Sequence, residues 1–498
     1  MVSRTGVFGV WLSRGGSRIG FPRTGKLVAL QAFSLLALGA CSGPSDGPRG
    51  NESGAESVAS AVSANQAARQ GEALFETAFP GTNGRSCASC HVRADHAVLN
   101  PAHVAATLAS NPADPLFNRL DADDPTAAVP TYEHLKKGLV RVVLTLPDNM
   151  DTIDPLGNVN TPPDRKIAVW RGVPTVENTA ITAPYQFDGR KGTLQEQAQG
   201  AITAHSEGGT VAQADLDAIA AFQKGEFSSN RAKYVATKLA HGVPVEQIDR
   251  PELKMDELTP AQQRGLGLYN ASCEPCHGGA TTNRIVNRNV HDFAIPELKP
   301  DGSGNVLFDT SVTPPVPVRA NRPNDEFLNI GIANLTAFGQ FGFPGIFTSN
   351  VPMPQYRFRF YADGTRAVAT ADLPPVPVFD PLTFQPLLDE NGAPIVGPNF
   401  LPQFFSTDPG RAVITGDPHD FEAFDMPSLR GIGNTAPYFH DNAAETLRDL
   451  VNIYSRFIIQ FFPMLNRPLV NPPEPGSAFP ESFTPQEKDD LIAFLQIL

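Results

Sequence analysis

Two short segments of this chain place a histidine directly after two closely spaced cysteines: CASCH at 87–91 and CEPCH at 273–277. Two thiols one helical turn apart can each form a thioether with a vinyl group on one porphyrin edge, and the next histidine then lies under the iron. A four-cysteine zinc site and a dithiol redox pair are the alternatives, and neither of them uses the histidines. The spacing predicts two covalently bound c-type haems, attached at Cys87, Cys90, Cys273 and Cys276 and ligated by His91 and His277.

The fifth cysteine, Cys41, ends a segment of a different kind. Residues 1–40 hold five basic and no acidic side chains, followed by an apolar run too short to span a bilayer, which is typical of an export signal. The run ends in LGAC, which resembles the lipobox of bacterial lipoproteins, where the cysteine is lipidated. The alternatives are an ordinary secretory cleavage site and a buried core helix. We expect a signal peptide over 1–40, a flexible polar tether over 41–65 and a periplasm-facing protein anchored by lipid at Cys41, most simply to the outer membrane.

The charge balance bears on partners. Removal of residues 1–40 takes away five positive charges and lowers the net charge from −13 to −18. Such a surface repels nucleic acid and anionic lipid and attracts a basic partner, although solubility alone is an alternative explanation. We therefore expect no nucleic-acid partner, and contact with a membrane only through the lipid anchor.

A second motif is also written twice, as TAPYQFDGRKGTL at 182–194 and as TAPYFHDNAAETL at 435–447. The copies, called TAPY loops below, agree at Thr, Ala, Pro, Tyr, Asp, Thr and Leu, but His440 stands where the first copy has Phe187. Apolar residues at helical spacing precede each haem motif, and a helical pattern follows each loop. Helix, haem motif, loop and helix form the plan of a small cytochrome c domain, so the chain carries this plan twice.

The two copies differ in length. The distance from the haem motif to the TAPY loop is 95 residues in the first copy and 162 in the second. The surplus lies within about 281–405, where the density of proline opposes helices and central strands. The predicted fold is mainly α: two tandem cytochrome c-like domains over 66–250 and 251–498, with a long Pro-rich irregular insertion in the second. Closing helices are expected at 214–225 and 484–498.

These motifs, together with DEFLNIGI, DPGRAV and MPSLRGIGNTAPYFHDN, resemble the bacterial dihaem cytochrome c peroxidase family, which includes the MauG-like enzymes. The likeness runs from about residue 66 to the end, interrupted by the Pro-rich insertion. It implies a cytochrome-c peroxidase-type oxidoreductase, with a peroxidatic haem in the first domain and an electron-transfer haem in the second. Hydrogen peroxide would be reduced to water at the first haem. Electrons would enter at the second from a small redox protein such as a monohaem cytochrome c or a cupredoxin.

The resemblance also assigns the acid–base chemistry. The family places a glutamate twenty residues after the aromatic of its FDGR-type loop, which is Glu207 here, and a glutamine of the same pocket falls on Gln197. A base beside the peroxide takes a proton from one oxygen and returns it to the other, so that water leaves. The alternative for Glu207 is a solvated loop acid. His205, two residues earlier, could assist, but we expect it to face solvent.

The sixth ligand of the second haem is also implied by the resemblance. Fourteen residues after the TAPYFH histidine, classical members place a methionine and MauG-like members a tyrosine, and here that residue is Tyr454. A phenolate holds ferric iron better than ferrous iron, so it would lower the potential of this haem. Met464 and Met426 are the alternatives, with Tyr454 then packed in the core. His440 is expected to be a pocket residue and not an iron ligand.

The chain departs from the family pattern at two positions. Phe187 stands where the family has a tryptophan between the haems, and a phenylalanine ring is hard to oxidise, so direct tunnelling or another route is implied. The family also binds calcium between its domains, through carbonyls that would be those of Thr435 and Pro437. Gly172 occupies the place of the asparagine ligand, so calcium stays an open alternative. The only tryptophan after the leader is Trp170, elsewhere in the motif.

Two other functions are compatible with these residues. One is a MauG-like oxidase acting on a partner protein or an organic molecule, which Tyr454 and the long insertion favour. The other is a non-catalytic electron carrier with both irons fully ligated, against which Glu207 argues. His96 and His103 could cap the first iron in a resting state, although a structural role is the simpler expectation because neither matches a family spacing. The oligomeric state is open, and a homodimer is among the alternatives.

Overall fold

A computed structural model describes most of the chain after the leader. The chain divides into two compact units, Met1–Ala55 and Glu56–Leu498, and all of the site residues discussed below belong to the second. The predicted signal peptide, Cys41 and Met464 lie outside the described residues. The structure describes residues 52–154, 158–250, 255–287, 297–298, 308–309, 316–317, 319–320, 327–332, 353–361, 369–372, 390–392, 406–416, 420–459, 465, 467–470 and 480–498.

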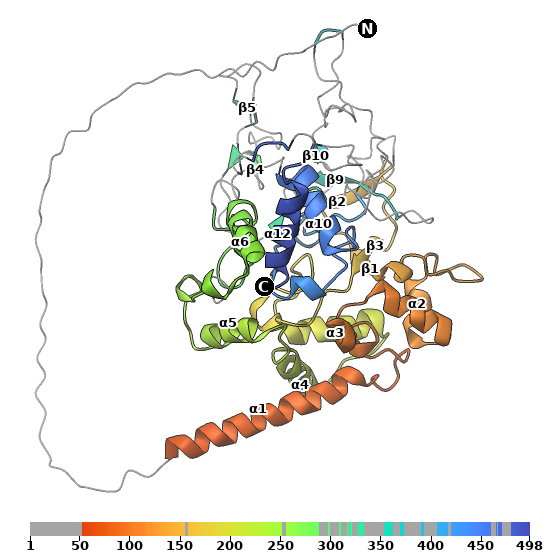
Figure 1. The fold of residues 1–498 in the computed structure, drawn as a ribbon. Coiled ribbons are helices and arrows are strands. Elements are labelled where there is room, and N and C mark those ends of the chain that lie inside the picture. Colours follow the sequence, from red (N-terminus) through yellow and green to blue (C-terminus); the bar gives the residue numbers. More distant parts are fainter. Residues whose placement is uncertain are drawn as a thin grey trace, which may run out of the picture. The chain divides into compact units, whose positions relative to one another are not determined.

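Helices dominate the regular structure, as the predicted mainly α class requires (Figure 1). The α-helices are α1 (Glu52–Glu76), α2 (Pro101–Ser110), α3 (Leu194–His205), α4 (Gln213–Gln223), α5 (Asn230–Ala240), α6 (Pro260–Ser272), α9 (Ala412–Thr415), α10 (Leu447–Ile453) and α12 (Pro485–Leu495). A π-helix, η14 (Tyr454–Ile458), continues α10. Short 3₁₀ helices are η1 (Cys87–Ser89), η2 (Arg93–Asp95), η3 (Pro115–Phe117), η4 (Arg119–Asp121), η5 (Leu135–Lys137), η6 (Thr179–Ile181), η7 (Val245–Gln247), η9 (Met255–Glu257) and η13 (Ile432–Asn434). Within the described part of the chain, no helix has the length and apolar character needed to cross a membrane.

Local sequence explains where several helices begin. A threonine at the N-cap and an acidic or amide side chain three residues later bond each other's backbone N–H groups at the starts of α3, α6, α10 and α12. This capping box satisfies N–H groups that the first helical turn leaves unpaired. Thr484 and Glu487 form such a box at the start of α12, and Pro260 lies in the first turn of α6.

Helix α1 differs from the expectation for its region. It begins at Glu52, inside the segment 41–65 for which the small, polar composition predicted a flexible tether. Alanine, glutamate and glutamine are good helix formers, and this stretch contains no proline after Glu52. A polar composition therefore did not exclude a helix here.

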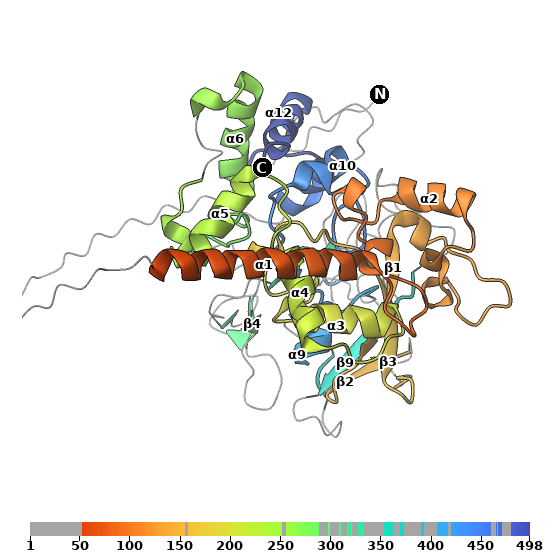
Figure 2. The same cartoon turned by 90° about the horizontal axis from the view of Figure 1, so that it is seen from below.

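The same helix crossing occurs in both halves of the chain. A Cβ on Gly71 of α1 would lie 1.9 Å from the carbonyl oxygen of Ala218 in α4, and a Cβ on Gly265 of α6 would lie 2.0 Å from that of Asp490 in α12. Each helix that precedes a haem motif thus crosses a helix that follows a TAPY loop at a point where only glycine fits. Figure 1 shows α6 beside α12, and Figure 2 shows α3 beside α4.

The two TAPY loops have the same local structure as well. Each contains a cis X–Pro bond, at Ala183–Pro184 and at Ala436–Pro437. The Tyr185 hydroxyl donates to the carbonyl of Thr179 at 3.0 Å, and the Tyr438 hydroxyl donates to that of Ile432 at 2.7 Å. The residues that the two copies share therefore make equivalent contacts.

Short strands complete the described fold, and all of their pairings are antiparallel. β1 (Leu139–Thr145) pairs with β3 (Lys166–Gly172), β2 (Met150–Ile153) with β9 (Arg357–Tyr361), and β9 with β10 (Ala369–Asp372). The remaining pairs are β4 (Glu297–Leu298) with β7 (Arg319–Ala320), β5 (Phe308–Asp309) with β6 (Val316–Pro317), and β8 (Phe327–Leu328) with β11 (Phe424–Asp425).

Part of the predicted insertion thus packs on the first half of the chain. In the β2–β9 pair, Met150 lies opposite Phe360, and Phe358 and Phe360 are buried with Leu144 in one apolar cluster. Burial of two phenylalanine side chains contributes a few kcal/mol. This segment is therefore part of the core and not surface cover, while most of the range 281–405 lies outside the described residues.

Candidate active site

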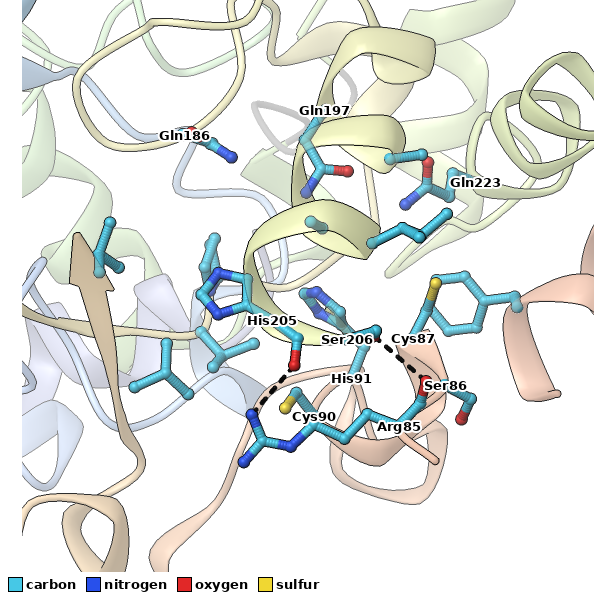
Figure 3. A pocket seen from close by; sticks show the side chains of 18 of the residues that line it. Arg85, Ser86, Cys87, Cys90, His91, Gln186, Gln197, His205, Ser206 and Gln223 are labelled. Carbon is cyan, nitrogen blue, oxygen red and sulfur yellow. Dashed lines mark hydrogen bonds between the residues drawn. The ribbon is translucent and has the colours of Figure 1, made fainter. Parts of the chain in front are cut away.

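A first cavity lies among α1, α3, α4 and the β1–β3 pair, and it encloses about 1070 Å³ of space, part of it open to solvent. The thiols of Cys87 and Cys90 and the ring of His91 line it. Four further polar side chains do so as well: Gln186, Gln197, His205 and Gln223 (Figure 3).

The His91 ring is held from one side only. Its Nδ1 donates to the carbonyl of Ala97 at 3.1 Å, and a second backbone carbonyl, that of Pro174, also acts on the ring. Burial lowers the pKa of His91, so the imidazole is neutral and its Nε2 carries a free lone pair. A neutral imidazole oriented by a carbonyl through Nδ1 is the usual form of a histidine metal ligand.

A second cavity repeats this arrangement around His277 and encloses about 1690 Å³, again partly open to solvent. The Nδ1 of His277 donates to the carbonyl of Pro427 at 3.2 Å, and burial lowers the pKa of His277 to about 4. Cys273 and Cys276 line the same cavity. Pro427, which follows Met426 in MPSLRG, corresponds to Pro174, which follows Val173 in the first copy. The carbonyl of Pro427 acts on His277 and that of Pro174 acts on His91, so equivalent carbonyls orient the two histidines.

The positions of the cysteines distinguish between a c-type haem, a four-cysteine zinc site and a redox dithiol. The two cysteine pairs line different cavities, so they do not assemble into one four-cysteine zinc site. Among the residues that the structure describes, no group of three or more His, Cys, Asp or Glu side chains is placed to hold a metal ion. Burial raises the pKa of the Cys90 and Cys273 thiols to about 12, whereas a redox dithiol requires a lowered pKa. A thiol pair beside a lone histidine in a large cavity fits a c-type haem.

Tyr454 lies in the second cavity with His277, at the start of the π-helix η14. Its ring stacks on Phe439 with the centroids 6.3 Å apart, and burial raises the pKa of its hydroxyl. Met426 lines the same cavity. The structure therefore brings both described candidates for the sixth ligand into the same cavity as His277.

Phe187 lines both cavities. On the side of the second cavity its ring meets His440 edge-on, with the centroids 6.4 Å apart. His440 in turn stacks on Phe424 at 3.8 Å. The His440 Nε2 has no hydrogen-bond partner in the described structure, and burial lowers the pKa of this histidine. Phe187 and His440 thus form part of the wall between the cavities, as pocket residues.

An ion cluster that the sequence gave no reason to expect supports this wall. Arg171 donates to Asp188 at 2.6 Å and to both carboxylate oxygens of Asp408, at 2.6 and 2.9 Å. Arg190 also donates to Asp188, at 2.6 Å. Although burial opposes the charged form, the two aspartates raise the pKa of Arg171. The only sequence signal was that Asp408 begins the DPGRAV segment.

Comparison with known proteins bears on the predicted family. Residues 65–240 match the family model described as di-haem cytochrome c peroxidase. The predicted family is thus confirmed over this part of the chain. This match covers the first haem motif and the first TAPY loop, and no curated protein matches the chain.

A MauG-like protein and a diheme peroxidase are among the solved structures that are similar to this chain. A MauG-like protein associated with microbial copper homeostasis is 17% identical, with 87% of this chain and 88% of that chain covered and a TM-score of 0.36. The diheme peroxidase BthA from Burkholderia thailandensis E264 is 16% identical, with coverages of 86% and 85% and a TM-score of 0.32. Hydrazine synthase from Kuenenia stuttgartiensis is 14% identical, with coverages of 94% and 100% and a TM-score of 0.33.

Of the two acid–base residues that the di-haem peroxidase pattern assigns, only one lines the first cavity. Gln197 does so from α3, and its side chain makes no hydrogen bond in the described structure. Glu207 is exposed, is not among the residues that line the cavity, and accepts a hydrogen bond from Asn83 at 3.1 Å. Its catalytic role stays a prediction. His205, expected to face solvent, instead lines the cavity.

The remaining sequence candidates lie outside the first cavity. His96 contacts Glu177 at 3.3 Å and His103 contacts Asp95 at 3.6 Å, and neither lines the cavity. Trp170 stacks on His134, with the centroids 4.3 Å apart, and lines neither cavity.

Gly172 stands where the family has the asparagine that binds calcium, and the side chain of Asn442 occupies the space beside it. A Cβ on Gly172 would lie 2.3 Å from the Asn442 side-chain oxygen, and the Asn442 amide donates to the carbonyl of Lys137 at 2.9 Å. Thr435 and Pro437 line the second cavity nearby. An asparagine of the TAPY loop therefore fills this space, and calcium stays an open alternative.

Proposed function

We propose that this protein is an exported di-haem peroxidase that reduces hydrogen peroxide to water in the first cavity, with electrons supplied through the second. The observation that carries the proposal is the unequal lining of the two cavities. The described residues that line the first include His91 and the unpartnered amides of Gln186 and Gln223, and no tyrosine or methionine. The second brings Tyr454 and Met426 together with His277 as candidates for a further iron ligand. One centre can thus accept a substrate while the other only exchanges electrons.

The polar lining of the first cavity suits a small hydroxylic substrate. The side-chain oxygens of Gln186 and Gln223 are buried without a hydrogen-bond partner in the described structure. A buried polar group left unpaired costs roughly 1–3 kcal/mol, so these amides would gain by binding a ligand that donates hydrogen bonds. A carrier protein with a fully ligated iron would gain nothing from such a lining.

The chain's own residues would divide the work as follows. Cys87, Cys90, Cys273 and Cys276 would hold two c-type haems by thioethers, in two tandem cytochrome c domains. His91 and His277 would ligate the two irons, with Tyr454 as the sixth ligand in the second cavity. When bound, the haems supply the electrons of the reaction, in which peroxide, two electrons and two protons give two waters. Gln197 would orient the peroxide, and a base beside it would move its proton.

The electron donor would be a small redox protein outside the lipid bilayer. A net charge of −18 after loss of the leader would favour a basic donor, through long-range attraction that salt weakens. Lipidation at Cys41 would keep the enzyme at the cell envelope.

The test uses protein matured in a host that attaches c-type haem. Mass spectrometry should find two added haem masses, and a Cys87→Ala/Cys90→Ala variant should retain one. Reduced protein should bind carbon monoxide at one iron, and turnover of peroxide should require a reduced donor cytochrome. An absence of carbon monoxide binding at either iron would leave only the carrier function.

A MauG-like oxidase is the second candidate, because Tyr454 lies in the second cavity where such members place their tyrosine ligand. The two functions differ in the fate of the oxidising equivalents from peroxide. A peroxidase consumes them with its donor cytochrome at a rate of many turnovers per second, whereas an oxidase retains them until a partner protein or an organic molecule is added. Stopped-flow spectra with peroxide alone, and then with reduced cytochrome, separate these outcomes.

A further inference from the structure

His205 is placed to reach a ligand in the first cavity. It is the last residue of α3, and Gln197, Ala201 and His205 follow one another at four-residue spacing, so they share one face of the helix. All three line the cavity, and Figure 3 shows the imidazole beside it, with Gln197 earlier on the same helix. Neither ring nitrogen of His205 has a hydrogen-bond partner among the described residues, so both are available to a ligand.

The backbone behind His205 is fixed by a buried cation. The carbonyl of His205 accepts from Arg85 at 3.3 Å and from the Asn83 side chain at 3.0 Å. Arg85 is itself buried and is held by Asp121 at 2.6 Å and by the carbonyl of Pro115 at 2.8 Å. The backbone at the end of α3 is therefore held in place, which keeps the Cα of His205 at the edge of the first cavity.

Glu207 points elsewhere for a local reason. Its φ is +54°, a left-handed conformation that residues other than glycine rarely adopt. The N–H groups of Ser206 and Gly208 both donate to the carbonyl of Ile202, at 3.2 and 3.0 Å, and close the end of the helix. Within this turn the carboxylate bonds Asn83 and is exposed. In this structure the Glu207 carboxylate therefore lies outside the lining of the first cavity.

We propose that His205, and not Glu207, is the catalytic acid–base residue of the first cavity. The inference rests on the proposed peroxidase function. The neutral imidazole takes a proton from one peroxide oxygen and returns it to the other as the O–O bond breaks, so that this oxygen leaves as water. The two electrons come from the donor protein, and solvent supplies the protons consumed.

The electrostatic surroundings suit this role. Burial lowers the pKa of His205; among the charges that act on it, Asp121 opposes this effect, and Arg85 and Arg190 add to it. His91 also interacts with it electrostatically. The imidazole is therefore neutral at pH 7 and able to accept a proton. Turnover should fall as the pH drops through the lowered pKa, since protonation removes the base.

The experiment compares His205→Gln with Glu207→Gln in the mature holoprotein. General-base removal costs about 10²–10⁴-fold, so we expect peroxide turnover to fall at least about 100-fold in His205→Gln and less than about threefold in Glu207→Gln. His241→Gln is the matched control, because His241 is exposed and bonds only the carbonyl of Thr237. Haem content and circular dichroism identify variants that fail to fold, in which case His205→Asn replaces His205→Gln.

A second measurement does not depend on activity. The stretching frequency of carbon monoxide bound to the reduced first haem should change with pH in the wild type and in Glu207→Gln, because a titrating imidazole lies beside it. It should be independent of pH in His205→Gln. Full turnover in His205→Gln with loss in Glu207→Gln would overturn the proposal while leaving the peroxidase function intact. A wild type without peroxide turnover would instead refute that function, and the frequency shift would then decide the place of His205 alone.

Discussion

The aspartates of the two TAPY loops occupy the same place in the repeat and are both almost fully buried, yet their surroundings are opposite. Asp188 bonds Arg171 and Arg190, and although burial opposes ionisation, these cations lower its pKa. Asp441 bonds the N–H of Ala443 at 3.2 Å, but its second oxygen has no partner in the described structure. Burial raises the pKa of Asp441.

This difference separates what the repeat conserves from what it changes. The shared proline, tyrosine and aspartate set the loop backbone in both halves. The charged neighbours differ. The first copy has Arg190 and Arg171, and the equivalent residues of the second copy are Ala443 and Phe424. The first cavity is thus lined by Arg171 and Arg190 of a paired ion cluster, and the second by aromatic rings such as Phe424 and Phe439.

Among the substitutions that test this comparison, we expect Asp188→Asn to have the largest effect on the free energy of unfolding. Asp188→Asn removes a carboxylate from two buried or half-buried arginines, and loss of one partner from a buried ion pair costs about 3–5 kcal/mol. Urea unfolding of the holoprotein, followed by circular dichroism, should show a loss of at least about 3 kcal/mol. A loss below about 1 kcal/mol would mean that Asp408 alone neutralises Arg171.

An intermediate effect is expected at the two helix crossings, which the halves share. Gly71→Ala and Gly265→Ala each place a methyl group within about 2 Å of a backbone carbonyl oxygen, and overpacking of this kind costs about 1–3 kcal/mol. Gly267→Ala in the same helix as Gly265 is the control, because nothing lies within 4 Å of its Cβ. It should stabilise the protein by up to about 1 kcal/mol in the same unfolding measurement.

The smallest effect should come from Asp441. Asp441→Asn removes a buried, unpaired carboxylate, so we expect a gain of about 1 kcal/mol near pH 7. A carboxyl group whose pKa is raised by folding stabilises the native state only at low pH, and that contribution is lost as the pH rises from the unfolded value near 3.8. The stability difference between variant and wild type should therefore grow from pH 4 to pH 7. A difference that shrinks over this range would indicate a hidden cation beside Asp441.

Local sequence predicted the parts of the fold that local chemistry controls. The helices expected at 214–225 and 484–498 are observed as Gln213–Gln223 and Pro485–Leu495. The haem motifs and TAPY loops were found because each depends on a few residues at fixed spacing. The β2–β9 pairing joins segments about 200 residues apart, and no short window of sequence contains that information.

The choice between Glu207 and His205 as the acid–base residue shows, within a single helical turn, the same limit of prediction from sequence. Spacing along the chain selected Glu207, but its side chain is exposed, bonds Asn83 and does not line the cavity. Helical spacing from Gln197 would have pointed to His205 instead, since residues four and eight positions later share a helix face. Arg171 could not be assigned to its cluster, because its partner Asp408 lies far along the chain.

The Phe187 ring belongs to the linings of both cavities. Any change in the volume of that ring therefore alters the shape of both cavities at once, so the two cannot be tuned independently at this position. A larger ring there would narrow the space on each side, and a smaller one would enlarge both.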